Sequence, residues 1–235
     1  MSEPWKRREV IGDAVLYLGE CRSVLVSVSG IDAVITDPPY SSGGMFRGDR
    51  AAKTSYKYIQ TDSTETMREE FSGDNRDQRA FLSWSSMWMT DLFLASNDGA
   101  TCMVFTDWRQ LPTVTDAVQC GGWVWRNLVT WWKPGIRMIR GRFSASAEYV
   151  VYASRGIPAE GEKSPQNVVK FRPVAGKEKT HIAEKPIELL EFLVEVTPAE
   201  ALVCDPFMGS GTTGVACANM GRRFVGIELD ERAFD

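Results

Sequence analysis

ALVCDPFMGSGTTG, residues 201–214, is the stretch that sets the fold class. Its apolar beginning, Ala201–Cys204, predicts a buried strand; a glycine turn follows, and a segment of helical period begins near Gly211. Glycines let the backbone pass close to a ligand, and the first turn of a helix offers free N–H groups. A strand, a glycine turn and a helix in this order are typical of ligand sites in open α/β sheets.

Three features of the C-terminal region narrow the choice of ligand. The glycines do not follow the Gly-x-Gly-x-x-Gly dinucleotide pattern, and no phosphate-loop lysine comes after them. Asp205 would repel a phosphate and attract a cation. Phe224–Glu228 predicts a second strand that ends in an acid, at a position that typically binds ribose hydroxyls. A nucleoside with a positively charged tail fits all three features, and S-adenosylmethionine is such a molecule.

A second motif, Asp37-Pro38-Pro39-Tyr40, follows the apolar run Ile31–Thr36. The proline rings fix φ and remove two backbone donors, so the turn is stiff and presents acceptors outward. A carboxylate beside a carbonyl suits an exocyclic amino group, and the tyrosine can stack on the ring that carries the amine. The motif therefore indicates a site for an aromatic amine such as adenine or cytosine, with an ordinary strand-terminating turn as the alternative.

Strand-like runs alternate with segments of helical period along the chain, which predicts an α/β fold with a mostly parallel sheet. The seven expected strands lie at about residues 9–11, 33–36, 100–105, 128–132, 148–153, 201–204 and 223–227. Helices are expected at about 78–96, at 111–119, from Pro186 onward and at 211–220. The tryptophans of the predicted elements are expected to pack in the core or at its rim; they are Trp84, Trp88, Trp123, Trp125, Trp131 and Trp132.

Composition and charge limit the classes of protein to which the chain can belong. The 235 residues, 43% apolar and 25% charged, suit one soluble domain, and neither a membrane span nor a signal peptide is evident. Five scattered cysteines indicate reduced thiols in a cytosolic protein, and one histidine without a Cys-x-x-Cys pair argues against a metal site. Residues 131–185 carry eleven basic and five acidic side chains, a net +6, which leaves −10 for the rest of a chain whose net charge is −4. This segment is either a nucleic-acid surface or a solvated charged face.

Three signatures together resemble the amino-group DNA methyltransferases that act on adenine N6 or cytosine N4. They are Asp37–Tyr40, His181–Pro186 and Asp205–Thr213, and the resemblance extends from Gly12 to Asp230. The catalytic motif precedes the cofactor motif, which is the permuted β-group order. The resemblance implies a single domain over residues 1–235, with a seven-stranded, mostly parallel, Rossmann-like sheet, one antiparallel strand and helices on both faces. Asp37 and Gly209 should then lie at the carboxyl ends of adjacent central strands.

The resemblance also implies roles for individual residues. Asp37, Pro38, Pro39 and Tyr40 would form the catalytic motif, in which Asp37 and the Pro38 carbonyl accept the amino protons and Tyr40 stacks on a flipped-out base. S-adenosylmethionine, with no metal, would be held by a larger set: Asp13, Lys185, Asp205, Phe207, Gly209, Ser210, Gly211, Thr212 and Glu228. Alternatives stay open for three of these, with Asp13 as a turn residue, Lys185 as a solvated helix-start residue and Glu228 as a surface acid.

Double-stranded DNA is the partner that the resemblance implies, in the cytosol of a bacterium or phage-infected cell. Two segments without periodicity, 41–75 and 155–180, are candidates for target recognition. The expected DNA contacts are Arg47, Arg50, Lys53, Lys57, Arg137, Arg140 and Arg142. A mobile lid is the alternative for the first segment, and a homodimer and a cognate restriction system are left open.

Aspartate at position 37 favours adenine, because cytosine-N4 enzymes more often begin this motif with serine. Cytosine N4 is the first alternative. Enzymes that methylate protein or RNA amines more often begin with asparagine and place the cofactor motif first, contrary to the order here. A non-catalytic nucleic-acid-binding module is the remaining class, although the complete tetrapeptide argues against it.

Overall fold

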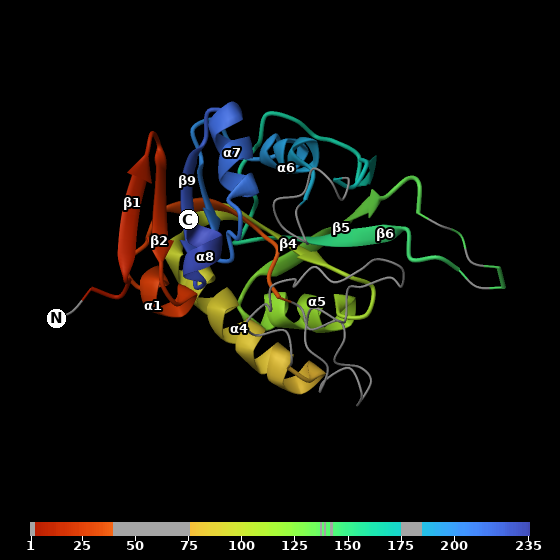
Figure 1. Cartoon of the computed structure of the whole chain (residues 1–235), viewed down its shortest axis with the longest axis horizontal. Coiled ribbons are helices and arrows are strands. Elements are labelled where there is room, and N and C mark those ends of the chain that lie inside the picture. Colours follow the sequence, from red (N-terminus) through yellow and green to blue (C-terminus); the bar gives the residue numbers. More distant parts are fainter. Residues whose placement is uncertain (1–2, 40–75, 137, 139, 142, 175–184) are drawn as a thin grey trace.

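A computed structural model describes residues 3–39, 76–136, 138, 140–141, 143–174 and 185–235 (Figure 1). Its described strands form one sheet in the order β1-β2-β9-β8-β3-β4-β6-β5-β7, in which only β1 and β6 run against the others. The strands are β1 (Arg7–Ile11), β2 (Ala14–Leu18), β3 (Ile31–Thr36), β4 (Ser96–Thr106), β5 (Val124–Trp132), β6 (Ala147–Ser154), β7 (Val168–Lys170), β8 (Leu202–Asp205) and β9 (Arg223–Glu228). The predicted α/β class with a mostly parallel sheet is confirmed.

Helices cover both faces of the sheet, as expected. On one face lie α1 (Cys21–Leu25), α4 (Gln78–Ala95) and α5 (Leu111–Cys120); on the other lie α6 (Ile187–Val194), α7 (Thr212–Asn219) and α8 (Glu231–Phe234). Figure 1 shows α6 and α7 on one side of the strands and α4 and α5 on the opposite side. Each face has its own core, with Trp88 and Leu92 of α4 in the first and Leu189 and Leu193 of α6 in the second.

Local sequence accounts for the helix boundaries. Asp77 caps α4, because its carboxylate accepts a hydrogen bond from the N–H of Ala80 at 2.9 Å. Pro186 occupies the N-cap of α6, and Gly121 follows the last residue of α5. All four predicted helices are therefore present, with ends within one or two residues of those expected.

The expectation of seven strands is wrong, because β2 and β7 were not predicted. The Gly12-Asp13 pair joins β1 to β2 in a two-residue hairpin, with Ile11 opposite Ala14 and Gly12 at a φ of +57°. Gly-Asp between two apolar runs is a hairpin signal that the sequence does contain. β7 has only three residues and pairs with β5 at the edge of the sheet; it lies inside the 155–180 segment, which was expected to lack periodicity.

The expected core residues are mostly where they were predicted. Trp88, Trp123 and Trp131 are buried, whereas Trp125 and Trp132 are each 45% exposed. All five cysteines are free, and Cys120 is the exposed exception among them. Across the described ranges, no helix has the length and apolarity to cross a bilayer.

Candidate active site

The two motifs that lie far apart in the sequence meet in space. β3 pairs with β8 in parallel, with Ala33 opposite Val203 and Val34 opposite Cys204. Both strands therefore end at the same edge of the sheet, which we call the carboxyl edge. The hydroxyl of Thr36, the last residue of β3, donates to Asp205 Oδ1 across 2.7 Å. The predicted meeting of residue 37 with the turn after β8 is confirmed.

Asp205 is the anchor of this junction. It is 3% exposed, and its carboxylate accepts hydrogen bonds from the Thr36 hydroxyl at 2.7 Å, the Thr213 hydroxyl at 2.8 Å and the Phe207 N–H at 3.1 Å. Burial raises the pKa of the Asp205 carboxyl to about 6, although these three donors oppose the rise. The side chain thus fastens β3, β8 and α7 together, and its predicted contact with the cofactor stays a prediction.

The glycine turn after β8 lies against the end of β9. The N–H of Gly209 donates to Glu228 Oε2 at 2.9 Å, while Glu228 Oε1 accepts from the N–H groups of Leu229 and Asp230, each at 2.8 Å. Gly209 and Gly211 have φ values of +52° and +78°, and apart from the adjoining residues of the chain no atom in the described ranges lies within 4 Å of where a Cβ would stand at either position. The turn is therefore both shaped by glycine and open on its outer side.

The other residues of the turn support it from both sides. Phe207 packs with its ring centroid 5.1 Å from that of Trp88 and 5.5 Å from that of Trp84. The hydroxyls of Ser210 and Thr212 lie 3.2 Å apart at the start of α7. The predicted cofactor residues from 205 to 212, together with Glu228, thus gather at one place on the carboxyl edge.

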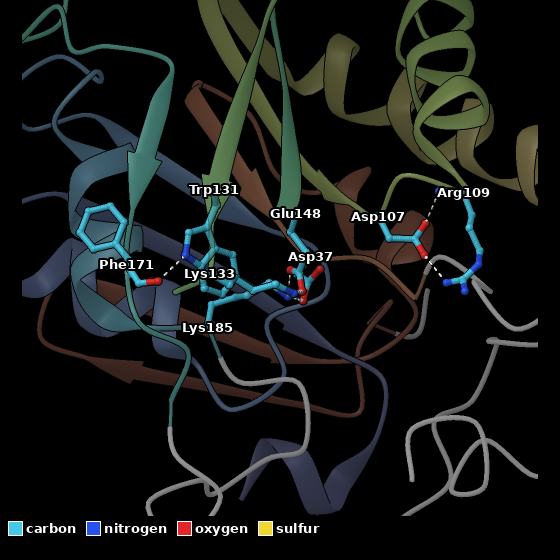
Figure 2. A network of polar contacts seen from close by, with 8 residues as sticks. All are labelled: Asp37, Asp107, Arg109, Trp131, Lys133, Glu148, Phe171 and Lys185. Carbon is cyan, nitrogen blue, oxygen red and sulfur yellow. Dashed lines mark hydrogen bonds and ion pairs between the residues drawn. The ribbon is translucent and has the colours of Figure 1, made fainter. Parts of the chain in front are cut away.

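Asp37, the first residue after β3, faces a cation. Its Oδ2 accepts a hydrogen bond from Lys185 Nζ, and the two side chains point toward each other in Figure 2. Asp37 Oδ1 is buried and has no hydrogen-bond partner among the described residues. Lys185 was predicted to lie near the carboxylate of the cofactor, and the structure places its ammonium on Asp37.

Two further residues, which the sequence did not single out, complete a charged network (Figure 2). Glu148 of β6 lies 3.7 Å from Lys185 Nζ through Oε2, and its Oε1 accepts a hydrogen bond from Lys133 Nζ at 2.7 Å. β6 runs against its neighbours β4 and β5, so its first residues lie at the carboxyl edge. The antiparallel strand β6 consequently brings Glu148 to Asp37, and Lys133 follows the end of β5; no local sequence pattern indicates this arrangement.

The charged network shifts the pKa of each of its three buried members, Asp37, Glu148 and Lys185. Burial raises the pKa of the Asp37 carboxyl; Lys185 opposes this rise and Glu148 adds to it. Burial works to lower the pKa of Lys185, but Asp37 and Glu148 together raise it above its ordinary value. Burial likewise works to raise the pKa of Glu148, and the two lysines overcome it and lower that pKa. Lys185 is therefore an ammonium at neutral pH, flanked by two carboxyl groups.

Asp13 does not join the site. It lies in the hairpin beside Phe224, whose N–H donates to the Asp13 carbonyl at 3.1 Å, at the opposite end of β9 from Glu228. The structure instead places Gly19 and Glu20 at the carboxyl end of β2, where the Gly19 N–H donates to the Glu228 carbonyl at 2.8 Å. The prediction for Asp13 is therefore wrong in position, because the hairpin moves it to the far edge of the sheet.

Of the remaining predicted site residues, some lie within the described ranges and others lie outside them. Pro38 is buried and Pro39 half-buried directly after Asp37, and Arg140 is exposed between β5 and β6. Outside the described residues lie Tyr40, Arg47, Arg50, Lys53, Lys57, Arg137, Arg142 and the 41–75 segment. The DNA-contacting roles of these residues stay predictions.

Comparison with known proteins gives a consistent result. Residues 31–235 match the model of a family described as DNA methylase, which covers N6 and N4 methyltransferases. A relative, the type II methyltransferase M2.MboI of Moraxella bovis, is 24% identical over 92% of this chain and 82% of its own length.

Solved structures share the fold. The chain superposes on M1.HpyAVI in complex with SAM with a TM-score of 0.64 and 24% identity, covering 93% of this chain and 95% of that one. It superposes on the cytosine-N4-specific PvuII DNA methyltransferase with a TM-score of 0.73 and 14% identity, covering 98% and 87% of the two chains. At these identities the likeness extends to the architecture of the sheet and its helices.

Proposed function

Because the chain belongs to the DNA methylase family, whose model matches residues 31–235, we propose that it transfers the methyl group of S-adenosylmethionine to adenine N6 in double-stranded DNA. Membership makes it an amino-group DNA methyltransferase; the choice of adenine and the roles of individual residues are the proposal. The observation that carries it is the Asp37 carboxyl group, which has one buried oxygen without a partner in the described part of the chain and lies beside the glycine turn that follows β8.

The turn and the end of β9 suit S-adenosylmethionine. The open outer side of Gly209 and Gly211 leaves room for a ligand close to the backbone. A carboxylate has about four acceptor positions, and backbone N–H groups occupy three of those on Glu228, so one is left for a ribose hydroxyl. When bound, the cofactor supplies a methyl carbon made electrophilic by the adjoining sulfonium.

Asp37 would act on the nucleophile. The amino nitrogen of adenine is a poor nucleophile, because its lone pair is delocalised into the ring. Hydrogen bonds from the amino protons to Asp37 and to the Pro38 carbonyl localise that lone pair on nitrogen, and Asp37 accepts the proton that is lost as the C–N bond forms. Positioning and electrostatics then supply most of the rate, without a covalent enzyme intermediate.

The target base must leave the duplex to reach the carboxyl edge, since its amino group is otherwise enclosed in the helix. Tyr40 would stack on the flipped base, and the basic residues of 41–75 and of the β5–β6 connection would hold the phosphates. A cognate restriction nuclease and a homodimer remain compatible with this function. Neither is needed for the chemistry.

Transfer of labelled methyl groups to duplex DNA tests the proposal. The purified protein is incubated with labelled S-adenosylmethionine and DNA of mixed sequence, and the DNA is digested to nucleosides. Label on N6-methyladenine is expected. Label on N4-methylcytosine would assign the enzyme to the other amino-group class, and the absence of label from DNA would overturn the proposal.

A further inference from the structure

The arrangement around Asp37 contains a conflict with the proposed chemistry. Asp37 Oδ1 has no partner among the described residues and can accept an amino hydrogen bond, but Lys185 Nζ donates to Oδ2 and works to lower the pKa of the carboxyl group, which opposes uptake of the proton lost as the C–N bond forms. Lys185 is only 9% exposed, so its ammonium has little access to solvent. Moving a buried ammonium away from its carboxylate is costly unless another anion receives it.

Glu148 is placed to receive that ammonium. Its Oε2 is buried, has no hydrogen-bond partner among the described residues and lies 3.7 Å from Lys185 Nζ. This separation is just beyond hydrogen-bond range, so a small rotation of the lysine side chain closes it. Figure 2 shows Lys185 reaching between the carboxylates of Asp37 and Glu148.

The position of Glu148 itself is fixed. Lys133 Nζ donates to Glu148 Oε1 at 2.7 Å, and its ammonium lies 5.5 Å from the centroid of the Trp131 ring. The indole N–H of Trp131 is in turn held by the Phe171 carbonyl at 2.9 Å. One oxygen of Glu148 is thus bound, and the other faces Lys185.

We propose that Glu148 is a positioning residue which takes the Lys185 ammonium from Asp37 when the amino group of the target base arrives. This inference rests on the proposed function. The exchange makes and breaks no covalent bond and moves no proton. Two carboxylates and two ammonium groups balance before and after it, while Asp37 loses the ammonium that opposes its uptake of the amino proton.

The variant Glu148→Gln tests this exchange, since it keeps the shape of the side chain and removes its charge. Lys185 then has Asp37 as its sole carboxylate partner within the described network. The single-turnover rate of methyl transfer at saturating DNA and cofactor is expected to fall about 10- to 100-fold, as for a misplaced catalytic group. Affinity for S-adenosylhomocysteine, measured by calorimetry, should stay at the wild-type value.

The pH profile separates positioning from a merely structural role. Glu148 raises the pKa of Asp37, so Glu148→Gln should move the acidic limb of the rate profile to lower pH. Glu195→Gln is the matched control, because it removes the same charge from the distant Lys163–Glu195 ion pair. It should leave both the rate and the profile unchanged.

The possible outcomes are distinct. A wild-type rate in Glu148→Gln, an unmoved acidic limb, or loss of rate together with cofactor affinity would each overturn the inference. If Glu148→Gln does not fold, the variant Glu148→Asp tests the exchange instead. It keeps the negative charge but has a shorter side chain, so the rate of methyl transfer should fall while the acidic limb of the pH profile stays in place. A wild-type rate in Glu148→Asp would then refute the exchange. If the wild-type protein labels no DNA, the proposed function itself fails, independently of these variants.

Discussion

Asp37 and Asp205 stand at the ends of two neighbouring strands, yet their surroundings differ in kind. Asp205 accepts three hydrogen bonds from neutral donors and is 3% exposed. Asp37 is bound by one ammonium on Oδ2, and its Oδ1 is buried without a partner in the described part of the chain. The same residue type, one strand apart, has three neutral donors in one place and, among the described residues, an unpartnered oxygen in the other.

The difference indicates that Asp205 stabilises the fold, whereas Asp37 keeps an oxygen that can accept a hydrogen bond from a ligand. A carboxylate that accepts three hydrogen bonds from the chain, with both oxygens engaged, fixes the elements that donate to it. A buried carboxylate with an unused oxygen carries a desolvation cost, which a substrate donor can relieve. We therefore expect substitutions at the two positions to separate activity from stability.

The largest effect is expected from Asp37→Asn, which keeps the size of the side chain and removes the carboxylate. Methyl transfer to duplex DNA should fall about 10³-fold, because a single amide oxygen accepts protons poorly and cannot take the proton from nitrogen. Binding of S-adenosylhomocysteine, followed by calorimetry, should remain. Turnover close to the wild-type value would remove Asp37 from the mechanism.

The second prediction concerns the pH dependence of stability at Asp205. Its pKa is raised from 3.8 to about 6 in the folded protein, so the native state holds this proton longer than the unfolded chain does. The free energy of unfolding should therefore fall as pH rises from about 4 to 6, by about 3 kcal/mol from this group, and no further above that range.

The variant Asp205→Asn is the control for this prediction, because an asparagine side chain does not titrate between pH 4 and 6. The difference in unfolding free energy between this variant and the wild type, from urea titrations at several pH values, should grow in favour of the variant between pH 4 and 6. A difference that is independent of pH would show that the carboxyl group titrates alike in both states.

Asp205→Ala should cost about 2 kcal/mol relative to Asp205→Asn at neutral pH. Asparagine can still accept from the Thr36 hydroxyl and the Phe207 N–H and can donate to the Thr213 hydroxyl, whereas alanine leaves these groups without partners. Urea unfolding of the two variants measures the difference. Equal stabilities would contradict the anchoring role of Asp205.

The smallest effect is expected from Gly209→Ala, matched by Gly12→Ala in the hairpin at the opposite edge. Both glycines have positive φ, at +52° and +57°, and both have open space where a Cβ would stand. Each change should lower the free energy of unfolding by about 1 kcal/mol through backbone strain. Only Gly209→Ala should also weaken S-adenosylhomocysteine binding; equal affinities in the two variants would show that the ligand does not approach this turn.

Much of the site could be predicted from the sequence. The strand that ends in Asp37 and the strand that ends in Asp205 each carry a continuous apolar run and a distinctive turn. The alternation of strands and helices then implied a parallel sheet, in which both turns share an edge. The helices from Gln78 and Leu111 were predictable for a similar reason, since their apolar spacing and end signals are local.

The errors have physical causes. Asp13 was expected near the cofactor because of the family resemblance. The Gly-Asp pair forms a hairpin turn, the alternative that was left open, which adds β2 and moves Asp13 to the far edge. The contact of Lys185 with Asp37, 148 residues away, was not foreseen because no local pattern indicates it; the role of Lys185 toward the cofactor, which the resemblance implied, stays a prediction.

The sequence by itself determined the chemistry at the ends of β3 and β8: a stiff proline turn with outward acceptors, and a glycine turn beside an acid. These features depend on local backbone geometry, which neighbouring residues set directly. Only the tertiary structure decided which charges surround Asp37. β6 enters antiparallel between β4 and β5 and thereby brings Glu148 to the carboxyl edge, together with Lys133 at the end of β5. The direction and neighbours of a strand depend on the packing of the whole sheet, so local sequence does not specify the partners that its end residues will meet.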